Sequence, residues 1–109
     1  MTYETYQPSS APSPAGAERG PWRVAVEYSN QGQAKPSTIV QIGNTEFEDH
    51  AFALATAQRT AFEYNPPDPW SPQGRNVFRD GPDGFLVVIE GATATFHMSV
   101  RLVEYVGKV

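Results

Sequence analysis

The sequence predicts an α+β protein with two layers, in which an antiparallel sheet of four to five strands packs on one helix. Three observations lead to this prediction. Segments near both ends of the chain alternate apolar and polar residues with the period of a strand. One stretch between them has apolar residues at helical spacing, and turn-forming residues separate the strand-like segments. The expected order is strand, strand, helix, strand, strand, strand, within a single domain at residues 21–109.

The first twenty residues differ in composition from the rest. Met1 to Gly20 contains no Val, Ile, Leu, Phe or Trp, and it includes Pro8, Pro12 and Pro14. Such a segment cannot bury enough apolar surface to offset about 1–2 kcal/mol of backbone entropy per residue. Residues 1–20 are therefore predicted to be a disordered tail.

Two strands are expected at the start of the domain. In "WRVAVEYS", Trp22, Val24, Val26 and Tyr28 alternate with more polar residues, as in a half-buried strand. The polar segment "NQGQAKPS" then predicts a loop, and "STIVQIG" a second short strand. The two strands should form an antiparallel hairpin with a long loop.

The next segment, "TEFEDHAFALATAQRTAFEYN", changes to helical spacing. The expected inward face consists of Ala51, Leu54, Ala55, Gln58, Ala61 and Phe62, with Phe52 on its flank. Thr45 with Glu48 matches a capping box, but we favour Asp49 as the N-cap, after an extended Glu46–Phe47. Pro66 and Pro67 end the helix.

The second half of the chain should form a proline-rich loop and three strands. "NPPDPWSPQG" cannot be a central strand, because four of its residues lack a backbone N–H. "RNVFRDGPDGFLVVIE" predicts a hairpin that turns at residues 80–84, and "FLVVIE", apolar on both faces, belongs in the middle of the sheet. In the last strand Phe96, Met98, Val100 and Leu102 alternate with His97, Ser99, Arg101 and Val103, which predicts one buried and one wet face.

Composition argues against several classes of function. The net charge is −4, and the eight Lys and Arg residues form no cluster, so neither nucleic acid nor a membrane surface is an expected partner. No apolar run approaches the ~20 residues of a spanning helix, and the chain does not open like a signal peptide. Cysteine is absent. These features predict a small soluble protein of the cytoplasm.

No catalytic or metal-binding motif is visible. His50 and His97 are the only histidines, and they do not match the spacing of a metal site. Ser99 and His97 share a strand face about 7 Å apart, too far for a direct hydrogen bond without help from rotamers. The sequence therefore predicts no catalytic residue, no metal ligand and no cofactor.

The candidate binding residues fall into two groups. Trp70, flanked by prolines, either plugs an edge of the core or forms a binding element together with Tyr64. His97, Ser99, Arg101 and Tyr105 line the wet face of the last strand, which could be solvated, could self-associate or could dock a partner.

The segment "FLVVIEGATATFHMSVRLVEYV", with "EYNPPDPW" before it, resembles small uncharacterised α+β proteins of high-GC actinobacteria. The resemblance covers about the second half of the chain and implies no functional residue. Two functions remain open. The favoured hypothesis is a non-enzymatic protein-interaction module that uses the open sheet face or the Trp70 loop. The alternative is a ligand-binding or enzymatic domain with a pocket between helix and sheet near Trp70, His97 and Arg101.

Overall fold

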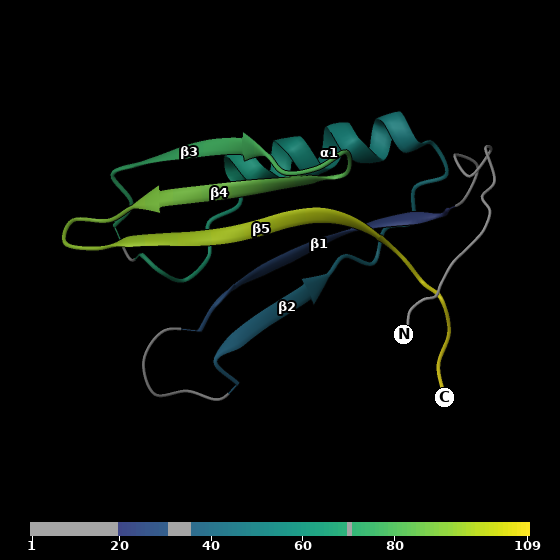
Figure 1. The fold of residues 1–109 in the computed structure, drawn as a ribbon, viewed down its shortest axis with the longest axis horizontal. Coiled ribbons are helices and arrows are strands. Elements are labelled where there is room, and N and C mark those ends of the chain that lie inside the picture. The colour runs from purple at the N-terminus through teal and green to yellow at the C-terminus, as the bar shows by residue number, and fades with distance from the viewer. Residues whose placement is uncertain (1–19, 31–35, 70) are drawn as a thin grey trace.

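The computed structural model of the chain describes residues 20–30, 36–69 and 71–109. The predicted tail, apart from Gly20, and Trp70 lie outside this part of the chain. The elements follow in the predicted order: β1 (Trp22–Ser29), β2 (Thr38–Ile42), α1 (His50–Glu63), β3 (Gly74–Arg79), β4 (Gly84–Glu90) and β5 (Thr95–Glu104). The α+β prediction is therefore confirmed (Figure 1).

The five strands form one antiparallel sheet in the order β2-β1-β5-β4-β3. Three strand pairs are local hairpins, and the pairing of β1 with β5 joins the two halves of the chain. β4 is an inner strand, as its apolar sequence predicts, while β5 occupies the centre. Helix α1 carries the chain from the β2 edge to the β3 edge and covers one face of the sheet (Figure 1).

The alternation along β5 is confirmed. Met98 and Val100 are completely buried and Leu102 is almost so, whereas His97 is exposed. Strand partners lie on the same face, so the helix-facing side gathers buried residues from β1, β4 and β5 into one core, with Ile39 of β2 and Val77 of β3 packed against it. Its largest fully buried side chains are Val87, Ile89, Met98 and Val100.

The predicted inward face of the helix is right at Leu54 and Ala61 and wrong at Ala51, Ala55, Gln58 and Phe62, which are exposed. The fully buried helix residues are Ala53, Ala57 and Ala61, spaced by four, and Leu54 packs beside them. Phe52 and Phe62 are instead 57% and 56% exposed. A stripe of alanines lets the helix backbone approach the sheet closely, and large rings at these positions would hold it away.

The start of the helix agrees with the preferred prediction. Asp49 is the N-cap, although its side chain makes no capping hydrogen bond, and Phe47 forms an isolated antiparallel bridge with Trp22. His50 then lies edge-on to the Trp22 ring, with 5.0 Å between ring centroids. Its Nε2 is 2.8 Å from Oδ1 of Asp83 in the β3–β4 turn, which ties the helix start to that turn.

The β3–β4 turn forms where the sequence predicts it. The β3–β4 turn closes through a hydrogen bond from the Asp80 amide to the Gly84 carbonyl, and Gly81 has a φ of 77°, a conformation that favours glycine. The proline-rich loop packs on the domain, because Pro66 and Pro69 are buried. Among the described residues, no helix is long and apolar enough to cross a membrane.

Candidate functional site

The face of the sheet opposite α1 has no covering element among the described residues. Strand pairing assigns to it every second residue of each strand. We call this surface the open face. Its side chains come from Thr38, Val40, Ile42, Arg23, Ala25, Glu27, Ser29, Thr95, His97, Ser99, Arg101, Val103, Leu86, Val88, Glu90, Asn76 and Phe78.

An ion pair lies at the middle of the open face. Nη1 of Arg101 on β5 is 3.0 Å from Oε1 of Glu27 on β1, and it also donates to Oγ of Ser99 at 3.1 Å. The side chains of Arg101 and Glu27 are 42% and 36% exposed, so both groups retain contact with water. This cluster fixes the guanidinium across two strands and places polar groups at the centre of the face.

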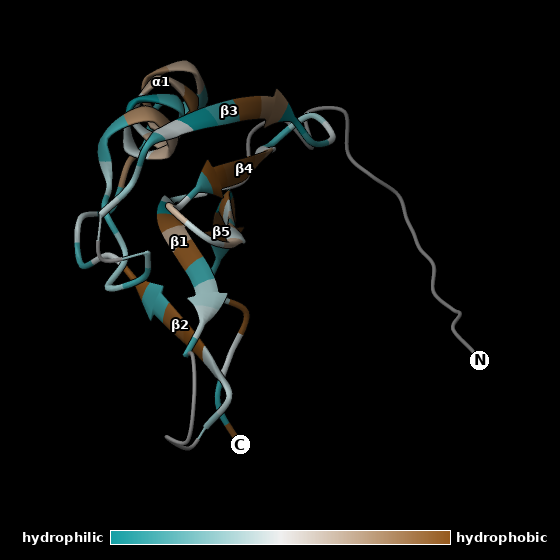
Figure 2. Cartoon of the chain, turned by 90° about the vertical axis from the view of Figure 1, so that its left-hand side faces the viewer, coloured by the Kyte–Doolittle hydropathy of each residue, from teal (hydrophilic) through white to brown (hydrophobic). Residues whose placement is uncertain are grey.

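Apolar side chains lie on both sides of this pair. On one side, Phe78 of β3 is 52% exposed and is paired with Leu86 of β4, and Val88 follows on the same face of β4. Leu86 and Val88 are half-buried. We call these three residues the apolar patch. On the other side, β2 exposes Val40 and Ile42. Figure 2 colours parts of β2 as hydrophobic.

The structure brings together three of the predicted site residues. His97, Ser99 and Arg101 all lie on the open face, with Arg101 bonded to Ser99 and His97 paired with Val88 next to the apolar patch. Tyr105 lies beyond the end of β5 and is 76% exposed. Because His97 and Arg101 face away from α1, they do not form the helix–sheet pocket that the alternative prediction required.

Tyr64 lies on the opposite side of the sheet, after the end of α1. Its hydroxyl donates to Oε1 of Gln41 at 3.1 Å, and Nε2 of Gln41 donates to the hydroxyl of Tyr28 at 3.2 Å. Burial, and then hydrogen bonding with Tyr28, raises the pKa of the Tyr64 phenol above its usual value of 10.0. This network attaches the helix end to β2, and its position indicates a structural role.

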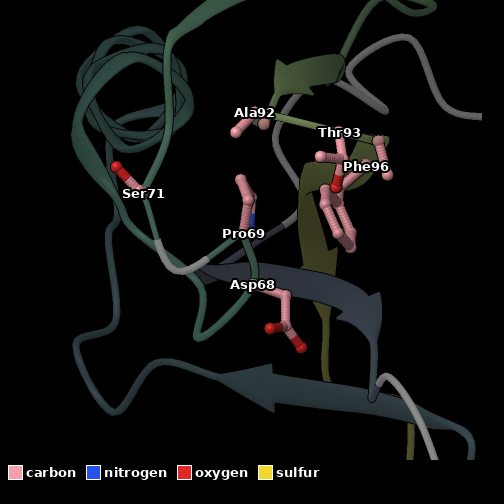
Figure 3. Close-up of a pocket in the computed structure, with 8 residues that line it drawn as sticks. Asp68, Pro69, Ser71, Ala92, Thr93 and Phe96 are labelled. Carbon is pink, nitrogen blue, oxygen red and sulfur yellow. The ribbon is translucent and has the colours of Figure 1, made fainter.

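One hollow lies between the proline-rich loop and the β4–β5 turn (Figure 3). Its volume is about 220 Å³, below the ~300–1,000 Å³ of typical ligand pockets. It is lined by Asp68, Pro69, Ser71, Gly91, Ala92, Thr93, Ala94 and Phe96. Figure 3 shows the Asp68 carboxylate and the Ser71 hydroxyl on different sides of Pro69, so these polar groups do not converge on a ligand.

A second, more open hollow of about 270 Å³ lies along the outer surface of α1. It is lined by Thr56, Arg59, Thr60, Glu63 and Tyr64. Within residues 20–30, 36–69 and 71–109, no group of three or more His, Cys, Asp or Glu side chains could hold a metal ion. Neither hollow therefore has the side chains of a catalytic or metal site.

Comparison with known proteins adds no relative. No protein-family model, no curated protein and no solved structure matches the chain. The resemblance to small actinobacterial proteins stays a prediction, and the candidate site depends on its geometry alone.

Sequence reasoning missed the apolar part of the open face. The sequence predicts Phe78 within a strand and Leu86 and Val88 within an apolar run, without indicating that the three share one surface. The alternation of side chains within each strand does predict which strand face each of these residues occupies. Their union into one patch depends on the pairing of Phe78 with Leu86, which no local pattern specifies.

Proposed function

We propose that the protein is a non-enzymatic interaction module that binds a protein partner through the open face. The observation that supports this proposal is the apolar patch, an exposed phenylalanine beside two half-buried aliphatic side chains on a face that no described element covers. An aromatic anchor with aliphatic neighbours is typical of the central part of a protein interface.

The ion pair of Arg101 and Glu27 would add specificity of orientation to an apolar contact. A charged pair adjoining an apolar patch can fix the register of a partner, because a mismatched partner would leave desolvated charges without compensation. Ser99 of β5 lies between Leu86 of the apolar patch and Glu27 of the ion pair, and His97, opposite Val88, adds a donor or acceptor beside the patch. Trp70 itself, the centre of the other predicted binding element, lies outside the described residues.

The test compares two exposed phenylalanines. Phe78→Ser alters the open face, whereas Phe62→Ser alters the outer surface of α1, where Phe62 is exposed to a similar extent. Tagged wild-type and variant chains are used to capture proteins from a lysate of the source organism, and each captured protein is identified and purified. Calorimetry should then show at least a tenfold weaker affinity for Phe78→Ser and little change for Phe62→Ser.

The same capture with and without residues 1–20 separates the domain from the tail. Binding that needs only residues 21–109 and Phe78 supports the open face. A partner that binds Phe78→Ser as tightly as it binds the wild type would rule out the apolar patch as the contact.

A further inference from the structure

The two edges of the sheet differ in charge. Residues 36–44, which contain the edge strand β2, include no charged side chain. At the opposite edge, β3 contains Arg75 and Arg79. Natural sheets protect their edges from pairing with another chain by charges, prolines, bulges or covering elements. Inside β2, the sequence TIVQI has neither a charge nor a proline.

The backbone hydrogen bonds show which groups β2 leaves unpaired. The Gly43 amide donates to the Val24 carbonyl, and the Asn30 amide donates to the Ser37 carbonyl. Hydrogen-bonded pairs alternate with non-hydrogen-bonded pairs along an antiparallel ladder. Between these two bonds, the backbone N–H and C=O groups of Ile39 and Gln41 therefore point toward β1. The N–H and C=O groups of Thr38, Val40 and Ile42 therefore point away from the sheet, since β2 is its last strand.

These three residues are complementary to themselves in the antiparallel direction. When Val40 of one chain is placed opposite Val40 of a second copy, Thr38 and Ile42 of the first lie opposite Ile42 and Thr38 of the second. Every pair in this register has both sets of backbone groups directed at the partner, and all the paired side chains are β-branched. Val40 and Ile42, now 50% and 52% exposed, would gain apolar contacts across the junction.

The β3 edge does not permit the same arrangement. There the Asp80–Gly84 hydrogen bond fixes the ladder so that Arg75, Val77 and Arg79 direct their backbone groups outward. Antiparallel self-pairing about Val77 would place Arg75 of one copy opposite Arg79 of the other. Like charges directly opposite are destabilising, so this edge disfavours a second copy.

We propose that two copies of the chain associate through their β2 edges, in antiparallel register about Val40, to form one continuous ten-stranded sheet. The strand that pairs with β2 is the β2 strand of a second copy. The edge is uncharged, its antiparallel register is symmetric about Val40, and β-branched side chains lie opposite one another across the two-fold axis. This proposal concerns the edge of the sheet, so it does not depend on a partner for the open face.

Val40→Pro tests the proposal with little direct effect on the monomer. It removes an outward N–H that β1 does not use, and proline is tolerated on edge strands. Val40→Thr is the matched control, since it keeps the N–H and the β-branched shape. In sedimentation equilibrium, the wild type and Val40→Thr should approach twice the 12.0 kDa mass of one chain as concentration rises, and Val40→Pro should remain near 12.0 kDa.

A second measurement uses the unaltered protein. Amide hydrogen exchange at Thr38, Val40 and Ile42 should slow by at least tenfold between low and high protein concentration, and exchange at Val77 should not change. This measurement remains decisive even where Val40→Pro unfolds.

The proposal has clear contrary outcomes. A wild-type chain that stays monomeric up to about 1 mM, which corresponds to roughly −4 kcal/mol of association free energy, would refute it. A dimer that Phe78→Ser dissociates while Val40→Pro does not would place the contact on the open face. Pairing of β2 only with an extended segment of another protein would show that a second copy is the wrong occupant.

Discussion

The alternation along β5 can be tested by truncating two neighbouring residues, Met98 and His97. Met98 is completely buried between the sheet and the helix, whereas His97 is exposed on the open face. The two residues share a strand and a backbone environment, so each is a control for the other. We expect Met98→Ala to destabilise the fold strongly and His97→Ala to leave its stability almost unchanged.

The size of the Met98 effect follows from its burial. The substitution removes Cγ, Sδ and Cε, and about 0.8 kcal/mol for each methylene-sized group gives a transfer loss of about 2.4 kcal/mol. A cavity in the central strand adds to this loss, and buried Met→Ala changes span roughly 2–5 kcal/mol. We therefore expect a loss of about 3 kcal/mol in the free energy of unfolding, and for His97→Ala a change within about 0.5 kcal/mol.

Urea unfolding followed by circular dichroism measures both values. Thermal unfolding gives a second readout, because a domain of this size loses about 4–8 °C in Tm per kcal/mol, so Met98→Ala should lower Tm by about 12–24 °C. A loss below about 1 kcal/mol for Met98→Ala would contradict the assignment of the core face. A loss above about 2 kcal/mol for His97→Ala would contradict the exposure of the open face.

Three further predictions concern other parts of the domain. Ala57→Leu should lower the free energy of unfolding by about 1–3 kcal/mol in urea titrations, because Ala57 has no exposed surface and a larger side chain would push α1 from the sheet. Wild-type stability should fall as pH rises above about 10, because the raised pKa of Tyr64 lets the folded chain keep a proton that the unfolded chain has lost. Tyr64→Phe should reduce this fall, as pH-dependent thermal melts would show. Trp70→Ala should cost a few kcal/mol in the same urea titrations if its ring plugs the core, and nothing measurable if the ring serves binding.

The sequence predicted the strands well because their signal is local. Period-two alternation from Phe96 to Leu102 specifies a buried and an exposed side without reference to any other element. The same alternation placed His97, Ser99 and Arg101 on one face. The pairing of Arg101 with Glu27 was not predictable in this way, because it depends on the long-range register between β5 and β1.

The helix shows where such reasoning fails. Phe52 and Phe62 are large apolar residues, so the hydrophobicity pattern predicts an inward face that includes Phe62 and has Phe52 on its flank. The structure buries Ala53 and Ala57 as well as the predicted Ala61, and the single methyl groups of these alanines contribute little to a hydrophobicity pattern. Close packing between a helix and a sheet favours small residues at the contact, and this requirement of shape is not visible in periodicity.

The central ion pair of the open face has a consequence for discrimination among partners. A purely apolar surface that covered Arg101 and Glu27 would remove water from both charged groups without replacing its hydrogen bonds. This desolvation penalty grows as more water is excluded from the contact. Partly unfolded chains, which expose mainly apolar side chains, should therefore bind the open face poorly. The proposed partner would have to bring polar groups to these two side chains, so the ion pair would select against purely apolar surfaces.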